Sequence, residues 1–247
     1  MAEYQKIQTL FKRDEKNIII PSMYTLPEFS YLENNLWECT EKIDGTNMRV
    51  ELIPNIDKNG EPVDIQMEFR GRTDKADIPK HLLEKMKQLF DRDKLVDYFY
   101  PERKDDFSKV TIYGEGYGIK IQKGGNYIKN NVDFILFDVK IGKWWLNREA
   151  CEKIAKDFGL KIVPLMGYMT IHEAINFVKK GFKSTIAENK DYDAEGLVLK
   201  TPNGLLLRNG ERLITKIKTV DFQKYLKVYG DTIVEQKLNP KYNENNN

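Results

Sequence analysis

Residues 195–218, EGLVLKTPNGLLLRNGERLITKIK, contain three short apolar segments separated by two turn sequences. The turn sequences, PNG at 202–204 and NG at 209–210, carry residues that favour tight reversals of the chain. Strands joined by such turns pair antiparallel. This stretch therefore predicts an antiparallel sheet.

The rest of the chain adds both strands and helices. Helical spacing or helix caps predict the helices, and apolar runs or alternation predict the strands. Because these elements interleave without a regular βαβ order, we expect an α+β fold with largely antiparallel sheets. The predicted helices cover 81–90, 92–99, 147–158, 170–180 and 221–229, and the other strands cover 36–53, 63–70, 110–116 and 133–142.

Three segments divide the chain. Residues 1–35 are irregular, with one short apolar strand at 18–21 and with Pro21 and Pro27 expected to break any helix, so they read as an arm packed on a core. Residues 36–230 form the predicted domain. The polar segment 231–247 is expected to be a flexible tail.

Composition excludes several classes of protein. The 247 residues include 40 Lys and Arg against 38 Asp and Glu, a net charge of +2, so bulk charge alone would not hold a polyanion. A mean hydropathy of -0.59 argues against a membrane protein. The polar N-terminus does not resemble a signal peptide, and two cysteines, Cys39 and Cys151, give no disulfide framework. We expect a cytoplasmic protein.

Familiar catalytic and nucleotide-binding motifs are missing. GEGYG at 114–118 has neither dinucleotide-fold nor P-loop spacing. His81 and His172 have no partner motif, so acyl-transfer chemistry has little support.

A lysine in an unusual setting remains. Lys42 lies in EKIDGTN at 41–47, at the end of a predicted strand, where packing gives a lysine no advantage. A lysine amine becomes a good nucleophile when it is desolvated or set beside other cations. Lys216 and Lys218 are two residues apart on one predicted strand and so share a face. Such a pair can bind phosphate and activate a third amine, although a solvated strand edge is the simpler alternative.

Three acidic residues also lie at strand positions. Glu115 ends a strand beside glycines, Asp138 interrupts an apolar strand, and Glu195 opens another. An unpaired buried carboxylate costs several kcal/mol, roughly, so each needs a partner. A metal ion, ribose hydroxyls or an arginine such as Arg72 would serve, and a structural ion pair is the alternative for each.

Together these segments resemble the ATP-dependent RNA ligase family of covalent nucleotidyltransferases. EKIDGTN is similar to the family's KxDGxN motif, and RGRT, YGEGYG, DFILFDV, AEGLVLK and ITKIK resemble the motifs that follow it in order. Asn47 is similar to the residue of the nick-sealing branch. The resemblance implies an α+β nucleotidyltransferase core, ATP-grasp-like, of largely antiparallel sheets flanked by helices.

The resemblance also implies a chemistry. Lys42 would take AMP from ATP and pass it to an RNA 5′-phosphate, which a 3′-hydroxyl then attacks, as in RNA repair. The implied catalytic residues are Lys42, Lys216 and Lys218. The implied ATP-binding residues are Glu41, Lys42, Ile43, Asp44, Gly45, Arg72, Glu115, Phe137, Glu195, Lys216 and Lys218. The implied RNA-binding residues are Asn47, Lys120 and Lys123, and Glu195 with Asp138 would lie near Mg²⁺, for which Mn²⁺ could substitute.

The loop GIKIQKGGNYIKNN at 118–131 offers a surface for RNA. Its lysines lie among Tyr117 and Tyr127, a mixture suited to contacts with phosphates and to stacking on bases. A solvated loop without a ligand is the alternative.

Alternatives remain open. A DNA ligase core, an mRNA-capping guanylyltransferase and a non-catalytic RNA-end-binding module share this fold. The 29 residues after Lys218 are too few for the OB-fold that larger relatives append, which leaves room for a protein partner in its place. The RNA itself is not indicated: a nicked duplex, a broken tRNA loop and free single strands all fit.

Overall fold

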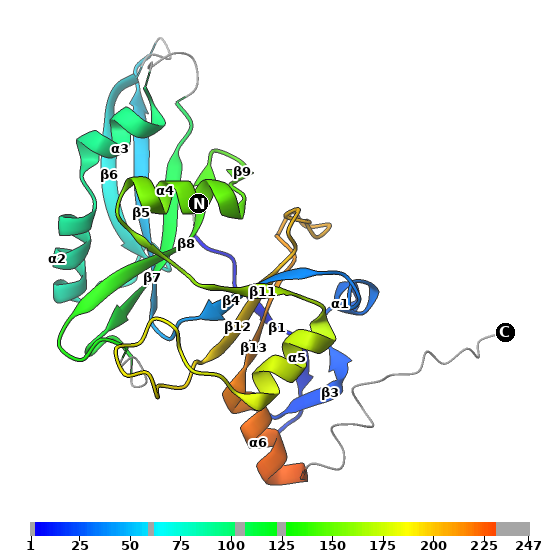
Figure 1. Ribbon diagram of the computed structural model, residues 1–247. Coiled ribbons are helices and arrows are strands. Elements are labelled where there is room, and N and C mark those ends of the chain that lie inside the picture. Colours follow the sequence, from blue (N-terminus) through cyan, green and yellow to red (C-terminus); the bar gives the residue numbers. More distant parts are fainter. Residues whose placement is uncertain (1–2, 59–61, 102–106, 123–126, 231–247) are drawn as a thin grey trace. The chain divides into compact units, whose positions relative to one another are not determined.

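The computed structural model describes residues 3–58, 62–101, 107–122 and 127–230, which divide into two compact units (Figure 1). Unit 1 comprises Met1–Gln5, Ile43–Val163 and Ile186–Asn189. Unit 2 comprises Lys6–Lys42, Pro164–Thr185 and Lys190–Asn247. The segment predicted as an arm therefore contributes to both units, and the tail predicted at 231–247 lies outside the described residues.

A six-stranded sheet forms the centre of unit 1. Its strands run in the order β10-β8-β7-β5-β6, with β9 beside β8, and every pair is antiparallel except β8 with β10. The strands are β5 (Thr46–Ile56), β6 (Pro62–Gly71), β7 (Val110–Gly118), β8 (Val132–Ile141), β9 (Trp144–Trp145) and β10 (Lys161–Ile162).

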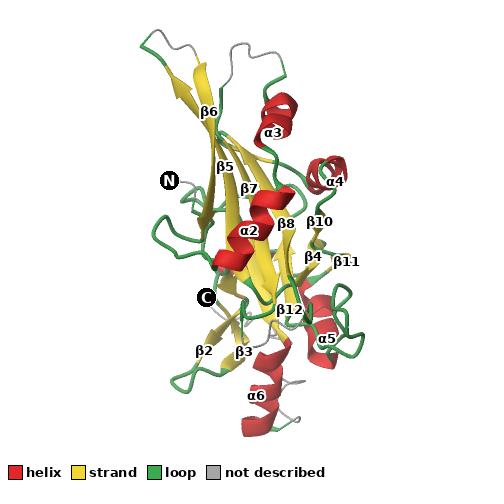
Figure 2. Cartoon of the chain, turned by 90° about the vertical axis from the view of Figure 1, so that its left-hand side faces the viewer, coloured by secondary structure: helices red, strands yellow, loops and turns green. Residues whose placement is uncertain are grey.

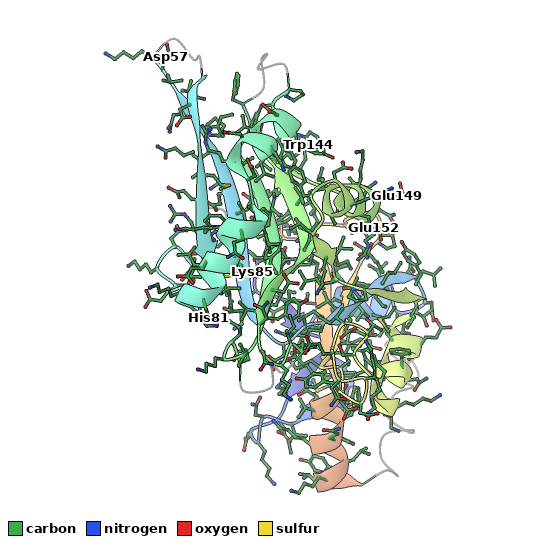
Figure 3. The ribbon with its side chains drawn as sticks, turned by 60° about the vertical axis from the view of Figure 1, so that its left-hand side comes forward. Asp57, His81, Lys85, Trp144, Glu149 and Glu152 are labelled. Atoms are coloured by element: carbon green, nitrogen blue, oxygen red, sulfur yellow. The ribbon has the colours of Figure 1, made fainter. Side chains whose placement is uncertain are left out.

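One face of this sheet packs against helices. These are α2 (Lys80–Leu89), α3 (Arg92–Phe99) and α4 (Arg148–Asp157), and α2 lies across the strands in Figure 2. The exposed side of α4 carries Glu149 and Glu152, which point away from the sheet in Figure 3. Met48, Val50 and Leu52 of β5 belong to the buried core, so the alternating residues between them point to the opposite face.

A β-bulge in β8 changes which side chains share that opposite face. Tyr113 of β7 pairs with Asp138, but the next residue, Gly114, pairs with Leu136, so Phe137 is an extra residue. Leu136 and Val139, on either side, both belong to the core. The bulge therefore keeps the core pattern while it directs Phe137 and Asp138 to the same side.

Unit 2 is built on a five-stranded sheet in the order β1-β13-β12-β4-β11. Only the pairing of β1 with β13 is parallel. The strands are β1 (Gln8–Thr9), β4 (Trp37–Lys42), β11 (Leu165–Met169), β12 (Gly196–Lys200) and β13 (Ile214–Lys218), and β2 (Phe11–Arg13) pairs separately with β3 (Ile19–Tyr24).

Helices cover one face of this second sheet. The helices of unit 2 are α1 (Pro27–Tyr31), α5 (Ile171–Lys180) and α6 (Thr219–Tyr229). Apolar side chains of α5 and α6 share a core with Trp37, Cys39 and Leu197. The alternating residues of β4, among them Lys42, therefore lie on the other face. No helix in the described part of the chain has the length and apolar character that crossing a bilayer requires.

Several local predictions are confirmed and two are wrong. Asn147 and Thr170 cap α4 and α5 as expected, and Thr170 forms a capping box with Glu173. Pro27, expected to break any helix, instead begins α1, because the first turn of a helix does not need its N–H. The strand expected at 205–208 is only an isolated bridge between Leu206 and Arg212.

Candidate active site

A row of three residues crosses the sheet of unit 2. In the registers of β4, β12 and β13, Lys42 pairs with Gly196 and Gly196 pairs with Lys218. The carboxylate of Glu195 accepts Lys42 Nζ at 2.5 Å on Oε2 and Lys218 Nζ at 2.5 Å on Oε1. The three charged side chains are 15–30% exposed. Glu195 thus holds the two amines on the same side of the sheet, within reach of solvent.

Gly196 makes this spacing possible. Its φ is +150°, and a Cβ atom there would lie 2.0 Å from the carbonyl oxygen of Ile217 and 2.8 Å from the Cα of Lys218. Only glycine adopts this conformation readily, and only glycine lets β12 approach β13 so closely. The glycine of the AEGLVLK motif is therefore a structural requirement.

We expect Gly196→Ala to lower the free energy of unfolding by about 3 kcal/mol or more, because both the backbone conformation and the contact with Ile217 are lost. Gly204→Ala is the matched control: its φ is +64° and no atom lies within 4 Å of the added methyl, so only about 1 kcal/mol is expected. Urea unfolding measures both. Equal losses for the two variants would contradict the close contact.

Lys216 lies on the same face as Lys218, one pair further along β13, opposite Val198. The third predicted lysine is therefore on the surface that carries Lys42. Cys39, also on β4, is fully buried on the other face, and burial raises its thiol pKa to about 12. A thiol this basic and inaccessible does not compete with Lys42 as a nucleophile.

Glu41 is a buried anchor. Its side chain accepts hydrogen bonds from the Ser184 hydroxyl, and from the Thr185 N–H and hydroxyl at 3.0 and 2.8 Å. Both carboxylate oxygens are thereby occupied. Ile43, on the other side of Lys42 in the sequence, is also buried. The residues that flank Lys42 are held in place by polar contacts and packing.

The turn after Lys42 packs within unit 1. The Asp44 N–H donates to the Tyr127 hydroxyl at 2.9 Å, and the Gly45 carbonyl accepts from Gln122 Nε2 at 3.2 Å. A Cβ atom at Gly45 would lie 2.3 Å from the Gly116 carbonyl oxygen. Gly45 is therefore required where this turn meets β7.

Asn47 and Glu115 are neighbours across β5 and β7. The Asn47 Oδ1 atom is buried, and no hydrogen-bond donor among the described residues reaches it. A buried amide oxygen without a partner is costly. Asn47 therefore has an unused acceptor beside a half-buried carboxylate, which fits the contact with a ligand that the sequence predicted.

The bulge residues lie around the N-terminal segment. The Tyr4 hydroxyl donates to Asp138 Oδ2, and the Tyr4 ring meets Phe137 edge to face at 4.9 Å. Tyr113 and Trp145 complete the aromatic cluster. Tyr4 gives no signal in the sequence, because it is a single aromatic residue in an irregular segment. Its hydroxyl supplies a partner that the buried Asp138 carboxylate was predicted to need.

We expect Tyr4→Phe to lower the free energy of unfolding by about 1–3 kcal/mol, since the Asp138 carboxylate loses a hydrogen bond in a buried setting. Tyr24→Phe is the control, because the Tyr24 hydroxyl lies 3.5 Å from Glu33 and makes only a weak contact. Thermal or urea unfolding distinguishes the two. A loss no larger than that of the control would mean that the Tyr4 hydroxyl contributes little.

The remaining predicted residues lie on loops of unit 1. Arg72 is exposed, as is Lys120, which has a φ of +60°. Lys123 lies outside the described residues. The prediction that Tyr117 and Tyr127 stack on RNA bases is wrong for this structure: both rings are fully buried and meet edge to face, where they fill the interior beside the loop.

The predicted residues thus fall into two sets. Unit 2 contains Glu41, Lys42, Glu195, Lys216 and Lys218. It brings the charged groups of Lys42, Glu195 and Lys218 together, whereas Glu41 is buried against Ser184 and Thr185. Unit 1 holds Ile43, Asp44, Gly45, Asn47, Arg72, Glu115, Lys120, Phe137 and Asp138. Within the described ranges, no group of three or more His, Cys, Asp or Glu side chains could hold a metal ion. Both oxygens of Glu195, which was predicted to lie near magnesium, are engaged by Lys42 and Lys218.

Comparison with known proteins gives a family and a fold. The RNA ligase family model matches residues 35–218, whereas no curated protein matches the chain. Three solved structures of Naegleria gruberi RNA ligase are similar: one with PPi (17% identity, TM-score 0.60), a mutant with ATP and Mn (16%, 0.58) and another mutant with AMP and Mn (18%, 0.57). The matches cover 93–94% of this chain but 58–59% of theirs. They confirm the predicted α+β nucleotidyltransferase fold.

Proposed function

The chain belongs to the RNA ligase family, and we propose that it uses ATP to join an RNA 5′-phosphate to a 3′-hydroxyl through a covalent lysyl-AMP. The observation that carries the proposal is the pair of amines, Lys42 and Lys218, that the Glu195 carboxylate holds on one face of the unit 2 sheet. The alternative, a solvated strand edge, does not account for two lysines that share one carboxylate.

The first step forms a phosphorus–nitrogen bond. The Lys42 amine attacks the α-phosphorus of ATP, the bond from that phosphorus to the bridging oxygen breaks, and pyrophosphate leaves. The attacking amine must lose a proton, and the Glu195 carboxylate, 2.5 Å from Nζ, is placed to accept it. This refines the sequence-based hypothesis, in which neighbouring cations alone activated Lys42.

Two further steps complete the reaction. An oxygen of the RNA 5′-phosphate attacks the lysyl-AMP, the phosphorus–nitrogen bond breaks, and the amine of Lys42 is regenerated. The RNA 3′-hydroxyl then attacks the activated 5′-phosphate, and AMP leaves. Lys216 and Lys218 stabilise the negative charge that grows on phosphate oxygens, an effect worth several kcal/mol, roughly, in a dry site.

The nucleotide contacts follow the family's pattern. Phe137 stacks on adenine, Glu115 holds the ribose, and Arg72 contacts sugar or phosphate. Glu41 and Ile43, both buried, act by shaping the backbone around Lys42. Asp44 and Gly45 are the proposed backbone contacts to phosphate, while the missing Cβ of Gly45 lets the turn pack against Gly116 of β7.

A divalent cation, Mg²⁺ or Mn²⁺, would neutralise phosphate charge when bound. Glu195 is the carboxylate we propose nearest to it, through water. Asp138 could contribute only after giving up its hydrogen bond from Tyr4. Asn47, whose Oδ1 accepts no hydrogen bond from the described residues, and Lys120 are the proposed contacts to the RNA end. A protein partner would add further contacts to RNA.

Labelling tests the proposal directly. The protein is incubated with Mg²⁺ and α-labelled ATP or GTP, and label that survives denaturation is measured. Label from ATP alone supports the ligase, label from GTP alone indicates a capping enzyme, and no label indicates a binding module. The labelled protein is then offered RNA and DNA ends that carry a 5′-phosphate. Transfer to DNA ends only would point to a DNA ligase core.

A further inference from the structure

A fully buried arginine lies in the middle of β5, on the face that carries Asn47. Arg49 alternates with the core residues Met48 and Val50 and is 0% exposed. Its neighbour across β7 is Tyr113, which in turn pairs with Asp138. A buried guanidinium is expensive unless it is paired and hydrogen-bonded. What Arg49 binds therefore indicates why it is there.

One side of the guanidinium joins a network of charges. Arg49 Nε lies 2.9 Å from Glu51 Oε1. The other oxygen of Glu51 lies 2.8 Å from Lys109 Nζ and 3.4 Å from Arg70 Nε. Glu51 is buried, so these cations balance its charge. This half of the network joins β5 to β6 and to Lys109, the residue before β7.

The other side of the guanidinium reaches a loop. Arg49 Nη1 donates to the Arg72 carbonyl at 3.2 Å, and Nη2 pairs with the Asp74 carboxylate. The loop also folds back on itself: the Ala76 N–H donates to the Thr73 carbonyl at 3.2 Å. A buried residue thus holds an exposed loop at two points, Arg72 and Asp74.

The Arg72 side chain stands apart from this network. Residues 72–77 are exposed, and the Arg72 guanidinium makes no hydrogen bond or ion pair with another described residue. Arg49 holds the backbone of Arg72 through the carbonyl and leaves its side chain available. Arg49 is therefore buried and holds the loop, whereas Arg72 is exposed and has its guanidinium available.

We propose that Arg49 is a positioning residue: it fixes the backbone of the 72–76 loop so that Arg72 is presented to the nucleotide. This rests on the proposed function, which gives Arg72 its contact with ATP. A lysine cannot replace Arg49, because one ammonium group cannot reach a carbonyl, Asp74 and Glu51 in the geometry of a planar guanidinium.

Single-turnover formation of lysyl-AMP at varied ATP concentration tests the coupling. We expect Arg49→Lys and Arg72→Ala each to raise the ATP concentration for half-maximal rate about tenfold, as expected for one lost charged contact. The double variant should match Arg72→Ala alone, because Arg49 acts through Arg72. If the double variant instead shows the product of the two single increases, the proposal is overturned.

Trypsin cleavage after Arg72 and Lys75 tests the positioning without any catalysis. In Arg49→Lys and in Asp74→Asn, whose side chain is 48% exposed and so tolerates the change, cleavage should accelerate about tenfold. Lys109→Ala is the matched control: it removes a cation from Glu51 but touches no loop residue, so cleavage and labelling should match the parent protein.

The two readouts separate the two claims. Unchanged cleavage in both loop variants overturns the positioning role, whatever the labelling shows. A parent protein that forms no lysyl-AMP, yet whose loop loosens in the variants, refutes the proposed function and keeps the role of Arg49 in holding the loop. Faster cleavage in Lys109→Ala as well would assign the effect to general stability and overturn the specific coupling.

Discussion

Lys42→Ala removes covalent labelling by ATP below detection, because the amine that forms the bond to phosphorus is gone. Lys42→Arg is expected to fail equally, since a guanidinium keeps the positive charge but is not a nucleophile at neutral pH. This loss of labelling is larger than for any other substitution, because the neighbouring groups only assist the reaction. The Lys42 nitrogen is itself one of the two atoms of the phosphorus–nitrogen bond. Denaturing gels after incubation with labelled ATP measure it.

The loss of label in Lys42→Ala is informative only if the variant protein is folded. The Lys42 side chain is 19% exposed and leaves no apolar cavity, so the unfolding midpoint should change little. Lys180→Ala, at the exposed end of α5, is the control and should label like the parent protein. Retained label in a stable Lys42→Ala protein would show that another residue carries the nucleotide.

Glu195→Gln is expected to slow lysyl-AMP formation about 100-fold or more. The carboxylate holds two amines at 2.5 Å, and its neutral isostere no longer fixes Lys42 and Lys218 there by charge. The proposed proton acceptor is lost as well, and a positioned acceptor contributes about 100-fold or more to a rate.

Single-turnover rates at saturating ATP measure the effect of Glu195→Gln. Glu211→Gln, an exposed carboxylate on the connection between β12 and β13, is the matched control and should react normally. A rate within threefold of the parent, about 0.65 kcal/mol, would mean that the bridge between the lysines is structural only.

Much of this arrangement was predictable from local pattern. Capping residues located α4 and α5, and alternation in ITKIK placed Lys216 and Lys218 on one face, as β13 shows. These signals are local, since a cap or an alternating strand is encoded within a few residues. The family motifs then identified Lys42, which the structure places in line with Gly196 and Lys218.

Contacts between distant residues were not predictable in this way. Tyr4 reaches Asp138 across 134 positions of sequence, and Arg49 reaches Asp74 across 25. Tyr127 looked like a stacking residue because loop composition suggests exposure, but its ring is buried and its hydroxyl holds the Asp44 N–H. Each of these contacts depends on which distant segments the sheet places side by side. No local sequence pattern encodes that arrangement.

The extra residue in β8 links chain length to the chemistry of the site. Exchanging Phe137 for another aromatic ring alters one surface and leaves the bulge in place. Deleting it would remove the bulge: Leu136 and Val139 would stay in the interior, and Asp138 alone would lie between them on the other face. The core of the sheet does not need the extra residue, so its retention among relatives would reflect the chemistry of the site and not the packing of the strand.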